Sequence, residues 1–213
     1  MSRWLIIVFF TVITGCSLTH AARDFPSTSA LANALKDGDL VFHESKSSQS
    51  RAIRLATKSR YTHVGIIRMV RGRPMVLEAV RTVRLTPFKR WRARGVGGHI
   101  VVKRLKDRQP LTLKSNRARL LQAGRRYLGK RYDGAFAWDE KRIYCSELVY
   151  RIYQRGLDIK LGSVETFGDM DLSSPVVQKL IKIRRGKNLD LEEPIITPVS
   201  IFNDSKLYTV GSL

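Results

Sequence analysis

Three residues of this 213-residue sequence are of the types that together perform thiol hydrolysis: Cys145, His63 and Glu78. A cysteine attacks as a thiolate, a histidine accepts and returns the proton, and a carboxylate orients the imidazole ring. Cys145 begins an apolar segment, residues 145–154, that the pattern of side chains predicts to be a helix. The helix N-terminus would lower the pKa of the thiol, and its free N–H groups would stabilise an oxyanion.

His63 and Glu78 lie on two segments that we expect to form a β-hairpin. Residues 62–70 and 75–80 are rich in β-branched side chains and are separated by the turn sequence Arg71-Gly72-Arg73-Pro74. Two side chains on adjacent strands can come into contact when they share one face of the sheet. The sequence therefore predicts a carboxylate beside an imidazole, which would hold the ring and stabilise its charged form.

Each of these residues also has a purely structural interpretation. A single cysteine in an apolar helix is commonly a small core residue, and a histidine in a strand can be structural. Glu78 is flanked by Leu77 and Ala79, and a buried carboxylate is costly without a partner. A zinc site built from His63, Glu78, Cys145 and another histidine would lack a closely spaced ligand pair. We therefore expect no metal and no cofactor.

The remaining pattern predicts an α+β domain, a small antiparallel sheet packed by helices. His43 and His99 adjoin predicted strands, and Asp39 begins the first of these as a structural residue. The further expected strands are residues 39–42, 100–105 and 202–210. The further expected helices are residues 48–57, 87–94, 115–128 and 176–183, and Gly156 is expected to end the helix that begins at Cys145.

The N-terminal residues have the layout of an export signal. Arg3 precedes an apolar run at residues 4–13 that is too short to span a bilayer, and Thr14-Gly15-Cys16 follows it. The four residues Ile13-Thr14-Gly15-Cys16 resemble a lipobox, the cleavage motif of bacterial lipoproteins. Cys16 is therefore predicted to be lipidated after removal of residues 1–15. Residues 16–29 then form a tether and residues 30–213 the folded domain. The alternative is an ordinary signal peptide, cut near Ala21-Ala22.

The composition indicates which partners the protein binds and says little about the reaction it catalyses. The net charge is +21, with Lys and Arg distributed along the chain and concentrated at residues 51–73, 89–94 and 182–187. Such a charge favours polyanions. The export signal makes nucleic acid an unlikely partner and indicates anionic lipid or an acidic envelope polymer instead.

Five segments in order carry a resemblance to a known family. They are Asp37-Gly38-Asp39-Leu40-Val41-Phe42, Tyr61-Thr62-His63-Val64-Gly65-Ile66-Ile67, Val76-Leu77-Glu78-Ala79-Val80, Gly129-Lys130-Arg131-Tyr132-Asp133 and Tyr144-Cys145-Ser146-Glu147-Leu148-Val149. From about residue 36 to the C-terminus the chain resembles the YiiX/YaeF-like branch of the permuted NlpC-type papain-fold hydrolases. His63 preceding Cys145 is the order that circular permutation of that fold would produce.

The resemblance implies a circularly permuted papain-like fold with Cys145 as nucleophile, His63 as general base and then acid, and Glu78 as the orienting residue. Tyr144 and Tyr61 flank the two reacting residues and could line the cleft. The implied reaction is amide cleavage through a thioester, without cofactor, on cell-wall peptides. With Ser17 after Cys16, the sorting rule of bacterial lipoproteins favours the outer membrane, facing the periplasm.

Two other functions remain open at this stage. The same triad would serve a lipid-directed acyltransferase or phospholipase, and the protein could instead be a non-catalytic lipoprotein that binds anionic envelope polymer. An apolar tunnel beside Cys145 would favour the lipid enzyme, and an open polar groove would favour the peptidase. Side chains of the triad that do not converge would favour the binding protein.

Overall fold

The computed structural model describes residues 28–186 and 189–213. The predicted signal peptide, the lipidation site Cys16 and almost all of the predicted tether lie outside the described residues. Within these residues no helix is both long and apolar enough to cross a membrane.

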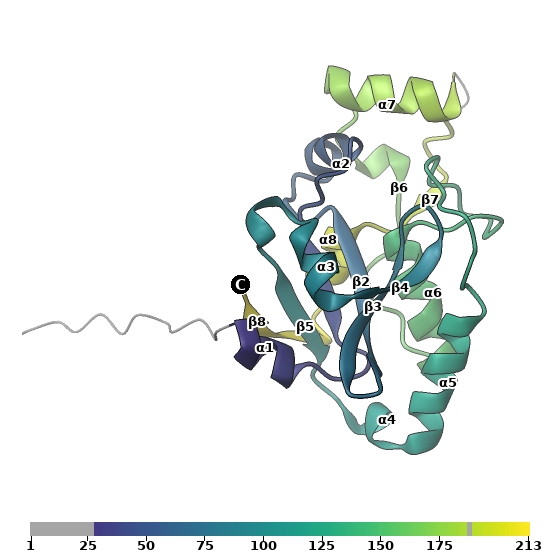
Figure 1. The fold of residues 1–213 in the computed structure, drawn as a ribbon. Helices are drawn as coiled ribbons and strands as arrows, with labels where there is room; N and C mark the ends of the chain where they lie inside the picture. The colour runs from purple at the N-terminus through teal and green to yellow at the C-terminus, as the bar shows by residue number, and fades with distance from the viewer. Residues whose placement is uncertain (1–27, 187–188) are drawn as a thin grey trace, which may run out of the picture.

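A single six-stranded antiparallel sheet organises the described chain, in the order β4-β3-β2-β1-β5-β8 (Figure 1). Its strands are β1 (Leu40–His43), β2 (His63–Val70), β3 (Arg73–Ala79), β4 (Val83–Pro87), β5 (Val101–Leu105) and β8 (Leu207–Ser212). A second, two-stranded sheet is formed by β6 (Glu165–Thr166) and β7 (Pro194–Ile195). The architecture is the α+β arrangement that the sequence predicts.

Helices cover both faces of the large sheet. They are α1 (Thr28–Ala34), α2 (Ser50–Thr57), α3 (Phe88–Ala93), α4 (Gln109–Thr112), α5 (Lys114–Arg125), α6 (Cys145–Leu157), α7 (Pro175–Arg185) and α8 (Pro198–Phe202), with short 3₁₀ turns at Val96–Gly98 and Phe167–Asp169. One core joins α5 and α6 to the sheet through residues such as Leu77, Leu120 and Leu148. A smaller core on the other face joins α1 and α3 through Leu31, Val76 and Trp91.

The central hairpin fixes the register of the site. Ile66 pairs with Leu77, so Glu78 lies opposite Gly65 and diagonal to His63 on the same face. The turn is tighter than predicted, because only Arg71 and Gly72 connect the strands. Both have positive φ, 49° and 75°, as the commonest two-residue hairpin turn requires.

A buried ion pair fastens the first strand to its neighbour. Arg104 of β5 donates to both carboxylate oxygens of Asp39, over 2.6 and 2.7 Å, and the Lys36 N–H donates to the same carboxylate over 2.7 Å. Asp39 therefore has the structural role expected of it, at the start of β1.

Several local predictions need correction. β4 is not among the strands that the sequence predicts. Burial does not alternate along it, since the adjacent residues Arg84 and Leu85 are both exposed. The last strand is Leu207–Ser212 rather than residues 202–210, because Pro198 begins helix α8, which ends at Phe202. Gly156 does not end α6. The helix continues to Leu157 and is capped by Asp158 in the left-handed conformation.

Gly156 serves packing instead. A Cβ atom built there would lie 2.8 Å from Cα of Leu120 in α5, closer than real Cβ contacts allow. The missing side chain lets α5 and α6 approach each other closely, and α6 is the helix that begins at Cys145.

We predict that Gly156→Ala destabilises the protein by about 1–3 kcal/mol, because the added methyl group meets backbone rather than a movable side chain. Urea unfolding measures this change. Gly168→Ala is the matched control, because its Cβ would have no neighbour closer than 3.4 Å. Equal effects of the two substitutions would contradict the close-packing explanation.

Candidate active site

Cys145 is the first residue of α6 and is almost completely buried. Tyr144 precedes the helix in extended conformation, so the N–H groups of the first turn have no partners within the helix. The backbone N–H groups of Val64 and Ser146 donate to the sulfur. The thiol therefore lies where backbone donors and the helix dipole favour its anionic form.

His63 forms an ion pair with this thiol. Burial alone would raise the pKa of Cys145, but the charge of His63 and its hydrogen bond to the sulfur bring the pKa below its ordinary value. For His63, burial alone would lower the pKa, whereas the Cys145 thiolate and Glu78 raise it to about 9. The lowered pKa of Cys145 and the raised pKa of His63 both favour the charged forms, so the pair is thiolate and imidazolium at neutral pH.

Glu78 is completely buried and has a partner for each carboxylate oxygen. His63 Nε2 donates to Oε2 over 2.7 Å, and Thr86 Oγ1 donates to Oε1 over 2.6 Å. Arg94 Nη2 donates to Oε1 as well. Burial by itself would raise the pKa of Glu78, but these three partners lower it to about 2. The carboxylate is thus charged at every pH at which the site would work.

A cluster of rings packs around the His63 imidazole. The ring centroids of His43, His63 and Trp91 form a triangle, with 5.3 Å between His43 and His63, 3.9 Å between His43 and Trp91, and 6.0 Å between His63 and Trp91. Burial, followed by the charges of His63 and Arg94, lowers the pKa of His43 to about 2. His43 therefore remains neutral and does not compete with His63 for the proton or the carboxylate.

A phenol also approaches the thiol. Gln49 Nε2 donates to the hydroxyl oxygen of Tyr132 over 2.6 Å. Burial raises the pKa of Tyr132 well above its ordinary value, and the charge of Cys145 is the next cause. Its hydroxyl group is therefore a neutral donor within electrostatic reach of the sulfur.

An apolar pocket opens beside Cys145. It spans about 740 Å³ of space, part of which is open to solvent. Its walls come from α2, from the segment Gly134 to Phe136, from α6 at Tyr144 to Ser146, and from α7, which lies above α2 in Figure 1. Apolar side chains such as Ile53, Leu180 and Ile181 dominate the lining.

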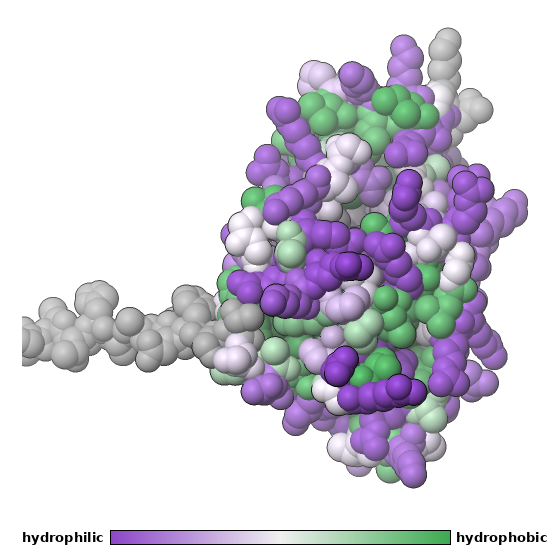
Figure 2. All heavy atoms as spheres, viewed as in Figure 1, coloured by the Kyte–Doolittle hydropathy of each residue, from purple (hydrophilic) through white to green (hydrophobic). Residues whose placement is uncertain are grey.

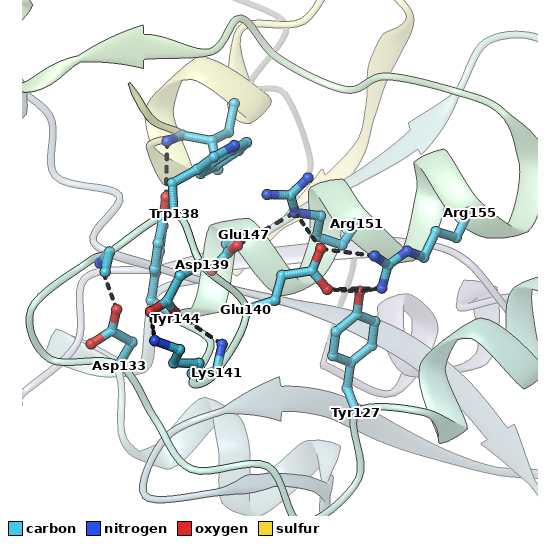
Figure 3. A network of polar contacts seen from close by, with 12 residues as sticks. Tyr127, Asp133, Trp138, Asp139, Glu140, Lys141, Tyr144, Glu147, Arg151 and Arg155 are labelled. Atoms are coloured by element: carbon cyan, nitrogen blue, oxygen red, sulfur yellow. Dashed lines mark hydrogen bonds and ion pairs between the residues drawn. The ribbon is translucent and has the colours of Figure 1, made fainter. Parts of the chain in front are cut away.

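The long loop before Cys145 is held against α6 by a network of charges (Figure 3). The two terminal nitrogens of Arg155, Nη1 and Nη2, each donate to one oxygen of Glu140 over 2.8 Å. The Tyr127 hydroxyl donates to the same carboxylate over 3.0 Å. Arg151 lies 3.3 Å from Glu140 and 3.4 Å from the buried Glu147. Burial, only partly offset by Arg151, raises the pKa of Glu147 to about 7. The network fixes the loop that supplies one wall of the pocket.

The predicted site residues fall into two groups. Cys145, His63 and Glu78 converge, and Tyr144 lines the pocket while its hydroxyl accepts from the Ile196 N–H over 3.1 Å. Tyr61 is not part of the pocket wall. Its ring instead stacks on Phe202, with centroids 4.0 Å apart.

Sequence reasoning missed three residues that contact the triad, Thr86, Arg94 and Trp91, and the phenol of Tyr132, whose pKa the charge of Cys145 raises. Thr86 lies on the strand that was not predicted, and the other three depend on contacts between distant segments. Only Tyr132 had a signal, since it belongs to one of the five segments that carry the family resemblance.

Comparison with known proteins agrees with this geometry. Residues 34–211 match the model of a family described as permuted papain-like amidase enzyme, YaeF/YiiX, C92 family. The chain is 41% identical over 185 residues to the uncharacterized protein YiiX of Escherichia coli K12, covering 87% of this chain and 90% of the relative.

A solved structure is similar as well. The crystal structure of YiiX from Escherichia coli O157:H7, described as a metalloprotein, matches with a TM-score of 0.78 and 41% identity. The match covers 84% of this chain and 97% of that chain.

We predict that iodoacetamide alkylates Cys145 well below pH 8.5, the ordinary pKa of a thiol, because the His63 charge lowers the thiol pKa. In His63→Ala the reaction should rise only near or above that pH, and Glu78→Gln should have a smaller effect because it leaves the imidazole in place. Mass spectrometry of the Cys145 peptide across pH 4–9 measures the rate. A profile that is the same with and without His63 would contradict the ion pair.

Proposed function

The chain belongs to the permuted papain-like amidase family YaeF/YiiX, so it is a cysteine amidase, and we propose that Cys145, His63 and Glu78 carry out its reaction. The observation that carries this assignment is the convergence of the three side chains. His63 forms a hydrogen bond with the Cys145 thiol and donates a second one, over 2.7 Å, to the Glu78 carboxylate. The other oxygen of this carboxylate also has a hydrogen-bond donor. A catalytic triad is identified by such geometry rather than by chain order.

In the first half of the reaction the Cys145 thiolate attacks the amide carbonyl carbon and forms a C–S bond. The negative charge on the carbonyl oxygen is stabilised by backbone N–H groups of the α6 N-terminus, with the Tyr132 hydroxyl as a further donor. His63 gives its proton to the amide nitrogen, the C–N bond breaks, and the amine leaves. A thioester on Cys145 remains.

In the second half water cleaves the thioester. Neutral His63 takes a proton from the attacking water, and the C–S bond breaks to release a carboxylic acid and regenerate the thiolate beside the imidazolium. Glu78 stays ionised throughout, with Thr86 and Arg94 holding it in place. It orients the ring and stabilises its positive charge.

The pocket favours an amide with a long hydrocarbon acyl chain over a cell-wall peptide as substrate. A stem peptide carries charged and amide groups that need hydrogen-bond partners, and an apolar lining supplies few. A hydrocarbon chain gains from the same lining at roughly 0.8 kcal/mol per buried CH₂. Cell-wall peptides remain the second candidate, suggested by the wider family. Convergence of the triad counts against the non-catalytic binding protein.

No step of this mechanism passes through a metal. The relative from Escherichia coli O157:H7 is described as a metalloprotein. Among residues 28–186 and 189–213, however, no group of three or more His, Cys, Asp and Glu side chains could hold a metal ion.

The proposal includes attachment to a membrane. Cys16 in the lipobox-like tetrad would carry the lipid, and the net charge of +21 suits a protein held against anionic lipid or polymer at the periplasmic side of the outer membrane. On the face drawn in Figure 2, hydrophilic side chains are spread widely, and apolar side chains form separate patches, one of them at the top, where α7 lies.

We predict that turnover depends on the length of the acyl chain. Second-order rate constants for N-acyl amides should rise at least about tenfold from acetyl to octanoyl, because each buried CH₂ contributes. Release of the amine measures the rate, and Cys145→Ala should abolish it. A constant rate along the series, with faster cleavage of a stem-peptide amide, would instead favour the cell-wall substrate.

We predict that radioactive palmitate labels the full-length protein in growing bacteria and that Cys16→Ser abolishes the label. The soluble fraction should then gain the protein. Cys145→Ser is the control, since the other thiol of the chain should not affect lipidation. Unchanged labelling in Cys16→Ser would contradict the anchor without bearing on the amidase chemistry.

A further inference from the structure

The apolar pocket beside Cys145 contains two charged residues, Arg184 and Arg185, among the residues that line it. Both lie in the last turn of α7, next to the segment Gly134 to Phe136. Two guanidinium groups are unusual in a wall otherwise suited to hydrocarbon. Arg184 is exposed to solvent, whereas the Arg185 side chain is only 11% exposed. A buried charge is costly unless all its donors find partners, so the position of Arg185 needs a reason beyond packing.

Arg185 is held in place by two of its guanidinium nitrogens, whereas the third has no hydrogen-bond partner. Its Nε donates to the Ala135 carbonyl over 2.7 Å, Nη1 pairs with Glu193, and the guanidinium lies 4.8 Å from the Phe167 ring centroid. Ala135 and Phe167 are both pocket residues. The side chain is only 11% exposed, yet its Nη2 is buried without any hydrogen-bond partner. A buried donor left unpaired calls for an acceptor.

Arg184 supplies a charge that no carboxylate of the described residues neutralises through an ion pair. Its guanidinium occupies the space in front of Gly134, where a Cβ atom would lie 3.1 Å from Cζ and Nη1. Gly134, Arg184 and Cys145 all line the same pocket. The positive charge therefore faces the space that adjoins the thiol.

We propose that Arg184 and Arg185 bind an anionic group, a carboxylate or a phosphate, carried by the amine part of an acyl amide whose hydrocarbon chain occupies the pocket. Guanidinium forks match the oxygens of both anions. The anion belongs to the amine part because the acyl part is an uncharged hydrocarbon chain, which the apolar lining accommodates. This inference rests on the proposed amidase function and narrows its substrate.

The first test compares three amides of the same dodecanoyl chain: those of ethanolamine, which is neutral, of glycine, and of phosphoethanolamine. At about 0.15 M salt, which screens remote charges, the full-length protein should cleave at least one anionic amide about tenfold more efficiently than the neutral one. The preference between glycine and phosphoethanolamine identifies the anion. Equal rate constants for all three would overturn the proposal.

Variants assign the effect to these arginines. Arg184→Gln should reduce the advantage of the anionic amide by about tenfold, and Arg184→Lys should restore part of it because the charge returns. Arg185→Lys keeps the charge but loses the fork, and should also reduce the advantage. Lys182→Gln is the matched control, an exposed position on the same helix outside the pocket. If Lys182→Gln and Arg184→Gln reduced the rate advantage of the anionic amide equally, the assignment of the anion site to Arg184 would be wrong.

A binding measurement separates this inference from the amidase proposal. Cys145→Ala cannot turn over, so calorimetry with this variant measures affinity alone. N-dodecanoylglycine or N-dodecanoylphosphoethanolamine should bind about tenfold more tightly than N-dodecanoylethanolamine, and the difference should disappear when Arg184→Gln is added. Such binding by a protein that cleaves no amide would refute the reaction and keep the anion site. Equal affinities for the three ligands would refute the anion site whether or not the reaction occurs.

Discussion

The rest of the site depends on one constraint, the buried charge of Glu78. A carboxylate with no solvent exposure must find its partners within the protein, and here they come from three places: the neighbouring strand at His63, the edge strand at Thr86 and the end of α3 at Arg94. Each of these bonds also fixes an element of the fold. The orientation of the catalytic imidazole is thus a by-product of satisfying one buried anion.

Two layers of the fold meet at the catalytic pair. His63 shares its sheet face with Glu78, His43 and the α3 residue Trp91, whereas Cys145 arrives on a helix that packs against the opposite face. The sheet side therefore holds the proposed base, and the helix side supplies the proposed nucleophile and the backbone donors. Close packing of α5 and α6 at Gly156, together with the Glu140 network, keeps the helix and its preceding loop in register with the sheet (Figure 3).

The pocket and its charges connect this geometry to a substrate. An apolar lining favours a hydrocarbon chain, and the two arginines at the end of α7 favour an anion near the bond to be cleaved. Together these features describe an amphipathic amide, which would concentrate at a membrane surface. The predicted lipid anchor and the high positive charge are consistent with an enzyme that meets its substrate there.

The sequence by itself determined most of the central elements and selected the candidate triad. Hydrophobic periodicity located β1, β2 and β3 and the helices α2, α5, α6 and α7. The chemistry of a thiol, an imidazole and a carboxylate selected Cys145, His63 and Glu78, because these signals are local or depend on residue type alone. Only the tertiary structure decided what surrounds them. Thr86, Arg94, Trp91 and Arg184 are ordinary residues on segments far from Cys145 in the chain, and Tyr61 proved to pack on Phe202 instead of lining the pocket. Such contacts arise when distant elements pack, and single-sequence patterns contain no record of which elements will meet.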